Sequence, residues 1–423
     1  MKYACFWGFC LPFILTCSIS ADVSSLTGNI FFDSNNDGVA EMTLNAVGLG
    51  LGTGPTTESN FVVAGNAMIS NALNVGGPTG SSNLNIHGTM SSSMQSISGN
   101  STLGNHSIVF VDSSSQAFAV EVKLPDASNM SGRQYTIKKT SISGNVLIMS
   151  GTSNSSNVID QSGHVILEEG ALGALQVISN GTTWNATSSL NAIYGPPVSG
   201  ANLIFWIDPS QRSSVTLDSS GNIAKLRDLS GRGHHLLPSG NAPIYKIGSE
   251  GINGVNCIYS DGGGLIHNNS GHGLSPKYFM STFVVYQYIS GASWSIAVNY
   301  GSGSSYMYMQ RQNLTANMQI RIDNNGVGNQ LAQNLGSVFD GSCHVFMFTL
   351  NAGTKNLSFY LDAGGIVSKT FSSLVAPLTF DNTINLGYSG TVCRIGEVLV
   401  FDMDLTAAER IALRNYLINK WGL

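Results

Sequence analysis

The chain has 423 residues, enough for two or three domains that each bury a core of their own. Only 10% of the residues are charged and 42% are hydrophobic, which excludes a disordered chain, because disorder combines high charge with low hydrophobicity. The formal net charge of −5 argues against nucleic acid as a partner, and the 49 glycines suit extended strands joined by tight turns.

Residues 1–21 have the pattern of a secretory signal peptide. Lys2 gives a positive start, residues 6–14 are an apolar run, and residues 18–21 are small enough for cleavage. The run is shorter than the about 20 residues that cross a membrane as a helix, and no later run is long enough. We therefore expect a secreted or cell-surface protein without a membrane span.

An acidic turn follows the signal peptide. Asp33, Asn35 and Asp37 alternate before a glycine, and oxygen ligands at this spacing can converge on calcium. Position twelve of such a loop is Leu44 instead of glutamate, and an Asp-Gly hairpin explains the same residues. We expect the hairpin and assign no metal ligand, and calcium is the one cofactor that the sequence leaves open.

The stretch 22–105 repeats short apolar units that end in glycine and a small polar residue, such as Gly48 to Thr53 and Phe61 to Asn66. Glycine at this frequency prevents a thick core within one chain, whereas several chains wound together can form a thin stalk. These units resemble the shaft of bacteriophage tail fibres and of their bacterial homologues. The resemblance implies a β-stalk.

Residues 106–190 contain six short strand patterns at regular spacing, which predict an all-β module. The patterns cover Ser107–Asp112, Ala119–Leu124, Gln134–Lys138, Val146–Met149, His164–Leu167 and Leu175–Ile178. Lys138 and Lys139 read as a charged strand edge that prevents further pairing. The order of the patterns resembles a β-prism-type module of tail fibres, which implies a homotrimer through the N-terminal half and no catalytic residue. Residues 191–200, with a Pro-Pro pair, read as the linker.

Residues 201–423 predict a two-sheet antiparallel sandwich closed by one helix. Strand patterns occupy Leu203–Ile207, 223–228, 281–289, 294–299, 306–310, 318–322, 343–350, 356–361, 378–386 and 395–401. Thr406 and Glu409 form a capping box at the start of the helix. Leu413, Leu417 and Trp421 recur at spacings of four, so one side of the helix can be buried.

The segments LIFWIDPS, LRDLSGRGHHL, STFVVYQY and GEVLVFDMDLTAAERIALRNYLINKWGL resemble the concanavalin A-like lectin/glucanase superfamily, in its laminin-G-like branch. The resemblance covers residues 201–423 and implies a jelly-roll sandwich, whose concave sheet binds sugar or protein in many relatives. It also implies that His234 and His235 belong to a structural turn after Asp228, although the two histidines would also suit a metal or acid–base site.

Catalysis is tested by the carboxylates of this region. Laminarinase-type relatives place Glu-x-Asp-x-x-Glu on one strand face, because a retaining glycosidase needs two carboxylates about 5 Å apart. No such run exists here, and we assign Glu397 to a strand face and Glu409 to the helix cap. We expect a protein that is not an enzyme, and a glycoside hydrolase with dispersed carboxylates is the alternative.

Four residues are candidates for ligand binding: Trp294, Tyr306, Tyr308 and Arg311. Tyr306 and Tyr308 alternate onto one strand face, where flat rings and a guanidinium suit sugar stacking and hydroxyl recognition. Aromatic residues that pack in the core would give the same pattern, so both interpretations stay open. The predicted function is a secreted binding or adhesion protein with a lectin-like domain for a glycan or surface ligand, and a purely structural fibre protein is a further alternative.

Three cysteines follow the signal peptide: Cys257, Cys343 and Cys393. They show no C-x-x-C pair and no histidine at zinc-finger spacing. One disulfide with a spare thiol and three small core residues explain them equally well.

Overall fold

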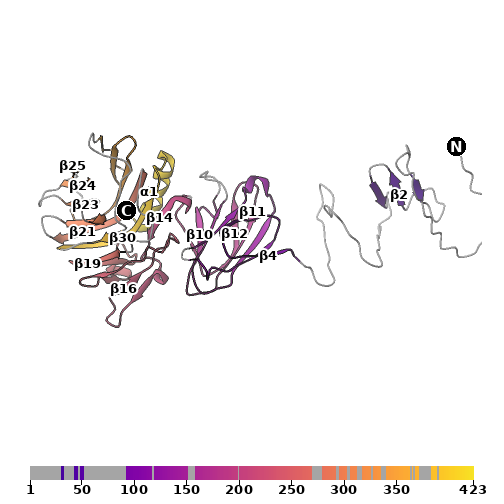
Figure 1. Ribbon diagram of the computed structural model, residues 1–423, viewed down its shortest axis with the longest axis horizontal. Coiled ribbons are helices and arrows are strands. Elements are labelled where there is room, and N and C mark those ends of the chain that lie inside the picture. Colours follow the sequence, from indigo (N-terminus) through magenta and orange to yellow (C-terminus); the bar gives the residue numbers. More distant parts are fainter. Residues whose placement is uncertain are drawn as a thin grey trace, which may run out of the picture. The chain divides into compact units, whose positions relative to one another are not determined.

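The computed structural model describes most of the chain beyond residue 91 and three short strands before it (Figure 1). The described residues are 30–32, 42–45, 48–51, 92–116, 119–150, 158–198, 200–268, 279–291, 295–302, 305–311, 317–324, 327–334, 340–362, 364, 367–370, 383–387 and 390–423. The predicted signal peptide and the acidic turn lie outside them. The chain divides into two compact units, Met1–Thr89 and Met90–Leu423.

The first unit contains one antiparallel sheet in the order β1-β2-β3. Its strands are β1 Ile30–Phe32, β2 Met42–Asn45 and β3 Gly48–Leu51. Phe32 pairs with Met42 in an antiparallel register, and the predicted Asp-Gly turn that connects these strands lies outside the described residues.

The second unit begins with two five-stranded sheets packed face to face, which we call the β-module. One sheet has the order β12-β11-β8-β6-β4, and its partner has the order β13-β10-β9-β7-β5. The strands are β4 Met94–Ile97, β5 Ser101–Thr102, β6 Ile108–Val111, β7 Val120–Leu124, β8 Gln134–Lys139, β9 Val146–Ser150, β10 His164–Leu167, β11 Ala174–Ser179, β12 Trp184–Leu190 and β13 Ala192–Tyr194. All six predicted strands of this region are confirmed.

The first strands of the β-module alternate between its two sheets. From β4 to β9 it changes sheet at every strand, so β4, β6 and β8 pair in parallel, as do β5, β7 and β9. Alternate apolar residues of both sheets then meet in one buried core around Tyr135 and Trp184. The module therefore includes β4 and β5, from the predicted stalk, and β13, from the predicted linker.

The charged-edge interpretation of Lys138 and Lys139 is wrong. Their strand β8 lies in the middle of its sheet, between β6 and β11. Lys139 points inward and is fully buried, and its Nζ donates to the backbone oxygens of Glu168 (2.7 Å) and Ala171 (3.1 Å). A lysine in a strand pattern can thus satisfy buried carbonyl groups instead of blocking an edge.

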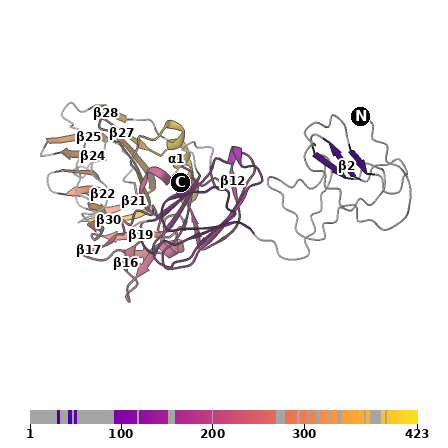
Figure 2. The ribbon, with the colours of Figure 1, turned by 45° about the vertical axis from the view of Figure 1, so that its right-hand side comes forward.

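The rest of the second unit is a sandwich of two large antiparallel sheets (Figure 2). The eight-stranded sheet runs β18-β19-β30-β21-β26-β27-β28, with β14 also paired to β30, and the seven-stranded sheet runs β17-β20-β29-β22-β23-β24-β25. The eight-stranded sheet comprises β14 Leu203–Ile207, β18 Ile244–Lys246, β19 Cys257–Asp261, β21 Phe279–Gly291, β26 Cys343–Asn351, β27 Asn356–Leu361, β28 Val367–Thr370 and β30 Thr391–Phe401. The seven-stranded sheet comprises β17 Leu237–Ser239, β20 Gly264–Asn268, β22 Ser295–Ser302, β23 Ser305–Arg311, β24 Asn317–Asn324, β25 Val327–Asn334 and β29 Thr383–Leu386, and β15 Val215–Leu217 and β16 Ile223–Leu226 form a separate pair.

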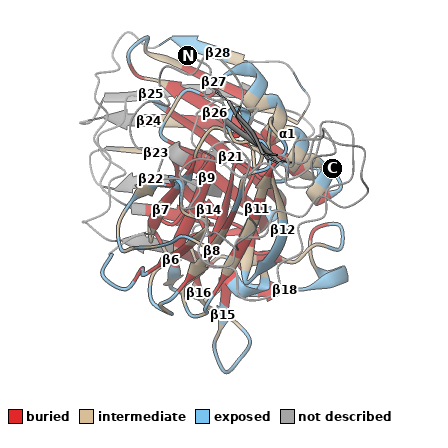
Figure 3. Ribbon diagram, turned by 90° about the vertical axis from the view of Figure 1, so that its right-hand side faces the viewer, coloured by how far each residue is buried: buried red, intermediate tan, exposed pale blue. Residues whose placement is uncertain are grey.

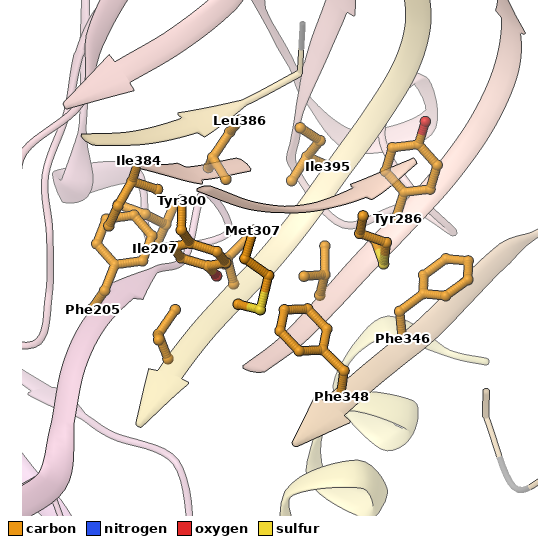
Figure 4. Packing of buried hydrophobic residues seen from close by; sticks show 14 of the residues in the cluster. Phe205, Ile207, Tyr286, Tyr300, Met307, Phe346, Phe348, Ile384, Leu386 and Ile395 are labelled. Atoms are coloured by element: carbon orange, nitrogen blue, oxygen red, sulfur yellow. The ribbon is translucent and has the colours of Figure 1, made fainter. Parts of the chain in front are cut away.

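Side chains between the two sheets form the largest buried hydrophobic cluster of the described residues. Figure 4 shows Tyr300, Met307 and Ile384 of the seven-stranded sheet facing Phe346 and Phe348 of the other. Strands β21 and β26 are buried over most of their length, because core residues cover both of their faces (Figure 3). The predicted all-β fold with a single C-terminal helix is confirmed, and the sandwich has the predicted two sheets.

The helix α1 spans Ala407–Trp421 and begins at the predicted capping box. The Thr406 hydroxyl accepts from the Glu409 N–H (3.3 Å), and the Glu409 carboxylate accepts from the Thr406 N–H (2.8 Å). Leu413, Leu417 and Trp421 are buried against the eight-stranded sheet, together with Phe283 and Leu399. The helix therefore covers the side of that sheet that faces away from the sandwich core.

The β-module covers the same side of the eight-stranded sheet. Val198, which follows the Pro-Pro pair, and Ile166 and Ile193 of the module belong to one buried cluster with Trp206 and Trp421. Ala119 N–H donates to the Gly231 oxygen (3.0 Å) across the same boundary. The eight-stranded sheet is thus packed on both sides, whereas among the described residues neither α1 nor the β-module packs on the outer side of the seven-stranded sheet.

Candidate functional site

The candidate binding site lies on the outer side of the seven-stranded sheet, on strands β23 and β24. Met307 and Met309 point into the sandwich core, so Tyr306 and Tyr308 point outward, where both are half-buried. On the neighbouring strand Ile320 and Ile322 point inward, so Arg321 shares the outer side with the tyrosines. Alternation along each strand thus brings three polar-tipped side chains to one surface.

The two tyrosine rings lie nearly parallel, one against the other. Their centroids lie 5.2 Å apart and their planes differ by 14°, which is a stacked pair. Tyr308 pairs with Arg321 in the β23–β24 register. The guanidinium carbon of Arg321 lies 5.8 Å from the Tyr306 centroid and 6.0 Å from the Tyr308 centroid. Both distances are within the range of a cation–π contact.

Such a platform can bind a sugar without reacting with it. A pyranose ring has a face of C–H groups that packs on an aromatic plane, while tyrosine hydroxyls and guanidinium N–H groups bond to its hydroxyls. We name Tyr306, Tyr308 and Arg321 the tyrosine platform.

The four candidate residues of the sequence divide between the platform and the undescribed parts. Tyr306 and Tyr308 share one face, as predicted. Trp294 lies outside the described residues. Arg311 ends β23, paired with Met318, and its side chain is not among those described. Arg321 was missed because only the register of two separate strands reveals that it lies beside the tyrosines.

A second cluster, of charged groups, lies under helix α1. Glu397 and Asp208 are fully buried, and Lys420 Nζ lies 2.7 Å from Glu397 Oε2 and 2.5 Å from Asp208 Oδ2. Burial lowers the pKa of Lys420 and the two carboxylates raise it, and their combined effect holds the pKa well above its usual range. Two close carboxylates beside a proton donor are the pattern of a glycosidase, so this cluster is the strongest competing site.

The hydrogen bonds of Glu397 assign the cluster to structure. Besides Lys420, its carboxylate accepts from Trp206 Nε1 (2.8 Å), Tyr416 OH (3.0 Å) and Trp421 Nε1 (3.3 Å). These donors occupy its acceptor positions and come from the strand and the helix that enclose it. The carboxylate therefore fastens α1 to the sheet and has no position left for a substrate.

The histidine turn has a similar structural role, as predicted. Asp228 is buried, and its carboxylate accepts from the backbone N–H groups of Trp206 (2.9 Å), Ser230 (2.9 Å) and His234 (2.9 Å). His235 Nδ1 in turn accepts from the Asp228 N–H (3.0 Å). The turn thus satisfies backbone donors at the boundary with the β-module.

The cysteines are free and do not form the disulfide that the sequence left open. Burial raises the pKa of Cys257 to about 11, and of Cys343 and Cys393 to about 12, so all three stay as thiols at neutral pH. Across the described part of the chain, no three His, Cys, Asp or Glu side chains gather as a metal site. None of the described helices has the length and apolar character to cross a membrane.

Comparisons with known proteins give only loose structural likenesses. No family model matches the sequence, and a search of curated proteins gives no significant match. Solved structures that resemble the chain include the receptor-binding domain of botulinum neurotoxin mosaic serotype C/D, with a TM-score of 0.41 and 13% identity over 52% of each chain. The binding domain of botulinum neurotoxin DC in complex with SialylT scores 0.40, also with 13% identity over 52% of each chain. The chain spans about half the length of these structures, and likenesses at this level assign neither a family nor a ligand.

Proposed function

We propose that the chain is a secreted, non-enzymatic binding protein whose sandwich recognises a glycan through the tyrosine platform. The stacked pair of Tyr306 and Tyr308 under the Arg321 guanidinium is the observation that carries the proposal. The platform lies on the side of the seven-stranded sheet that neither α1 nor the β-module covers. The sequence resemblance of residues 201–423 to concanavalin A-like lectins is consistent with ligand binding on a sheet face.

The N-terminal repeats supply the display part of the proposal. In this arrangement residues 22–89 form a stalk that trimerises and holds the sandwich at a cell surface or outside the cell. Three sites that bind weakly on one stalk gain avidity without any new contact. Light scattering of the secreted chain is expected to give a trimer, and a monomer at micromolar concentration would contradict the stalk.

A glycan array, probed with the purified full-length chain with and without calcium, tests the binding. We expect a limited set of glycans to be retained, and the Tyr306→Ala/Tyr308→Ala variant to lose at least about tenfold in affinity, because each ring–sugar contact contributes on the order of 1 kcal/mol. Tyr259→Ala is the matched control, since that ring also lies under a cation, Lys246, but on the eight-stranded sheet. Retention of no glycan, or equal binding by the platform variant, would overturn the proposal.

A further inference from the structure

A pocket of about 220 Å³ opens on the seven-stranded sheet, at the end of β17, β20 and β29. Its lining residues are Ser239, Gly240, Gly262, Gly264, Leu265, Asn385 and Gly387. Ile384 and Leu386 on either side of Asn385 point into the sandwich core, so the Asn385 amide points to the outer side of the sheet. The pocket and the tyrosine platform therefore share one sheet face.

Glycines build the floor of the pocket. Gly264 pairs with Ser239, and a Cβ at Gly264 would collide with the Gly387 carbonyl oxygen. Gly262 and Gly387 have φ of +77° and +63°, which favours glycine. The glycine run at residues 262–264 thus has a physical reason, and the floor it leaves is backbone without side chains.

The lining chemistry is neutral and polar. None of the seven lining residues is charged, and Asn385 and Ser239 contribute an amide and a hydroxyl. An amide both donates and accepts, and a hydroxyl does the same, which matches the paired character of sugar hydroxyl groups. A phosphate, a carboxylate or a metal ion would lack a charged partner here.

Strand register places the pocket at a fixed distance from the platform. Asn385 of β29 pairs with Asn299 of β22, and Asn299 pairs with Tyr308 of β23. Neighbouring strands lie about 4.8 Å apart, so Asn385 and Tyr308 are separated by about 10 Å across the sheet. One sugar ring cannot contact both residues at that separation, whereas a short oligosaccharide that runs across the strands can.

We infer that the Asn385 pocket is a second subsite of the glycan site, and that the ligand is an oligosaccharide of three or more residues with a neutral sugar at the pocket end. This inference rests on the proposed function of the tyrosine platform. One sugar ring stacks on the platform, and the pocket binds the hydroxyl groups of a second sugar. The sugar between these two lies over β22.

Isothermal titration with mono-, di- and trisaccharides cut from the best array glycan tests the chain-length requirement. For the unaltered chain we expect the trisaccharide to bind at least about tenfold more tightly than the monosaccharide, since it gains the hydrogen bonds of the pocket. Equal affinity for the three lengths overturns the second subsite and leaves the platform in place. Binding of all three lengths that the platform variant leaves unchanged is instead the failure of the proposed function.

Two variants locate the second subsite. Asn385→Ala removes the amide, and Ser239→Tyr places a ring over the pocket from the exposed end of β17. Both are expected to reduce trisaccharide affinity about tenfold and to leave monosaccharide affinity unchanged. Asn415→Ala, on the exposed surface of α1, is the matched control and keeps both affinities. Because Asn385 is buried, Asn385→Ala can fail to fold, whereas Ser239→Tyr changes an exposed residue and tests the pocket independently. Unchanged trisaccharide affinity in Ser239→Tyr overturns the inference.

Discussion

The two sheets of the sandwich place polar side chains on their outer sides in opposite ways. Behind the eight-stranded sheet, Glu397 and Asp208 are fully buried and bonded to donors from α1. On the seven-stranded sheet, Tyr306 and Tyr308 are only half-buried and stack in parallel. In this fold the carboxylates that look catalytic hold layers together, whereas the parallel rings are the side chains to which we assign the proposed ligand.

The contrast also separates two kinds of experimental effect. Changes behind the eight-stranded sheet should lower stability and leave the proposed glycan affinity intact in the folded fraction. Changes on the outer side of the seven-stranded sheet should lower affinity and leave stability nearly intact. A variant that lowers stability and affinity together would contradict this separation.

The largest expected stability effect comes from Glu397→Gln. The amide places two N–H groups among the donors Trp206, Tyr416 and Lys420, and it leaves the lysine with one carboxylate partner instead of two. Removing one partner of a buried ion pair costs roughly 3 kcal/mol. Urea unfolding followed by tryptophan fluorescence measures this loss.

Glu409→Gln is the matched control, because the glutamine can keep the reciprocal hydrogen bond of the capping box at an exposed position. Its free energy of unfolding should change by less than about 0.5 kcal/mol. If Glu397→Gln were no more destabilising than this control, the structural assignment of the buried cluster would be wrong.

The next effect is a pH dependence at the boundary between the β-module and the sandwich. His164 is fully buried, has no hydrogen bond to either ring nitrogen among the described residues, and meets Trp206 edge to face at 5.5 Å between centroids. Side chains at Gly195 or Gly200 would collide with its ring. Burial lowers the pKa of His164 to about 4.

A histidine whose pKa falls on folding takes up its proton more readily in the unfolded chain. The free energy of unfolding is therefore unaffected by His164 above its ordinary pKa of about 6.5. As the pH falls from there towards 4, the free energy of unfolding decreases by up to roughly 3 kcal/mol. His164→Leu should remove this pH dependence in unfolding experiments between pH 7 and 4. A variant with the same acid sensitivity as the unaltered chain would show that other groups cause it.

Much of this architecture could be predicted from local patterns. Six of the ten strands of the β-module follow from alternating apolar residues, and α1 follows from the capping box and the spacing of Leu413, Leu417 and Trp421. These signals are local, since each depends on residues within one element. Which distant strands pair with each other depends on more than one element, so the parallel pairing of strands β4 to β9 could not be predicted.

The same limit applies to the site and to the boundary. Tyr306 and Tyr308 were predictable because they alternate on one strand, but Arg321 enters only through the register of β24. His164 stands in the run His-Val-Ile-Leu, which is typical of any buried strand. Lys139 was misread because a lysine at the end of a strand pattern gives no sign of the two carbonyl oxygens that it meets inside the module.

The smallest effect concerns an ion pair of the eight-stranded sheet that is not enclosed. His344 Nδ1 lies 2.7 Å from Asp362 Oδ2, and its Nε2 lies 3.6 Å from Asp340 Oδ1. The aspartate side chains are 37% and 43% exposed. The hydrogen bond with Asp362 raises the pKa of His344, so its contribution is present below the ordinary pKa and is lost as the pH rises through the raised value.

Solvent screens this pair, so we expect its contribution to be below about 1 kcal/mol. Comparing unfolding of His344→Gln and the unaltered chain at pH 6 and pH 9 measures it: the variant should be less stable at pH 6, and the difference should shrink at pH 9. The pair lies on the same sheet as Glu397, so the two experiments vary exposure while the sheet stays constant. A loss at His344 as large as that at Glu397 would mean that charge alone, and not enclosure by α1, determines how strongly polar groups stabilise this sheet.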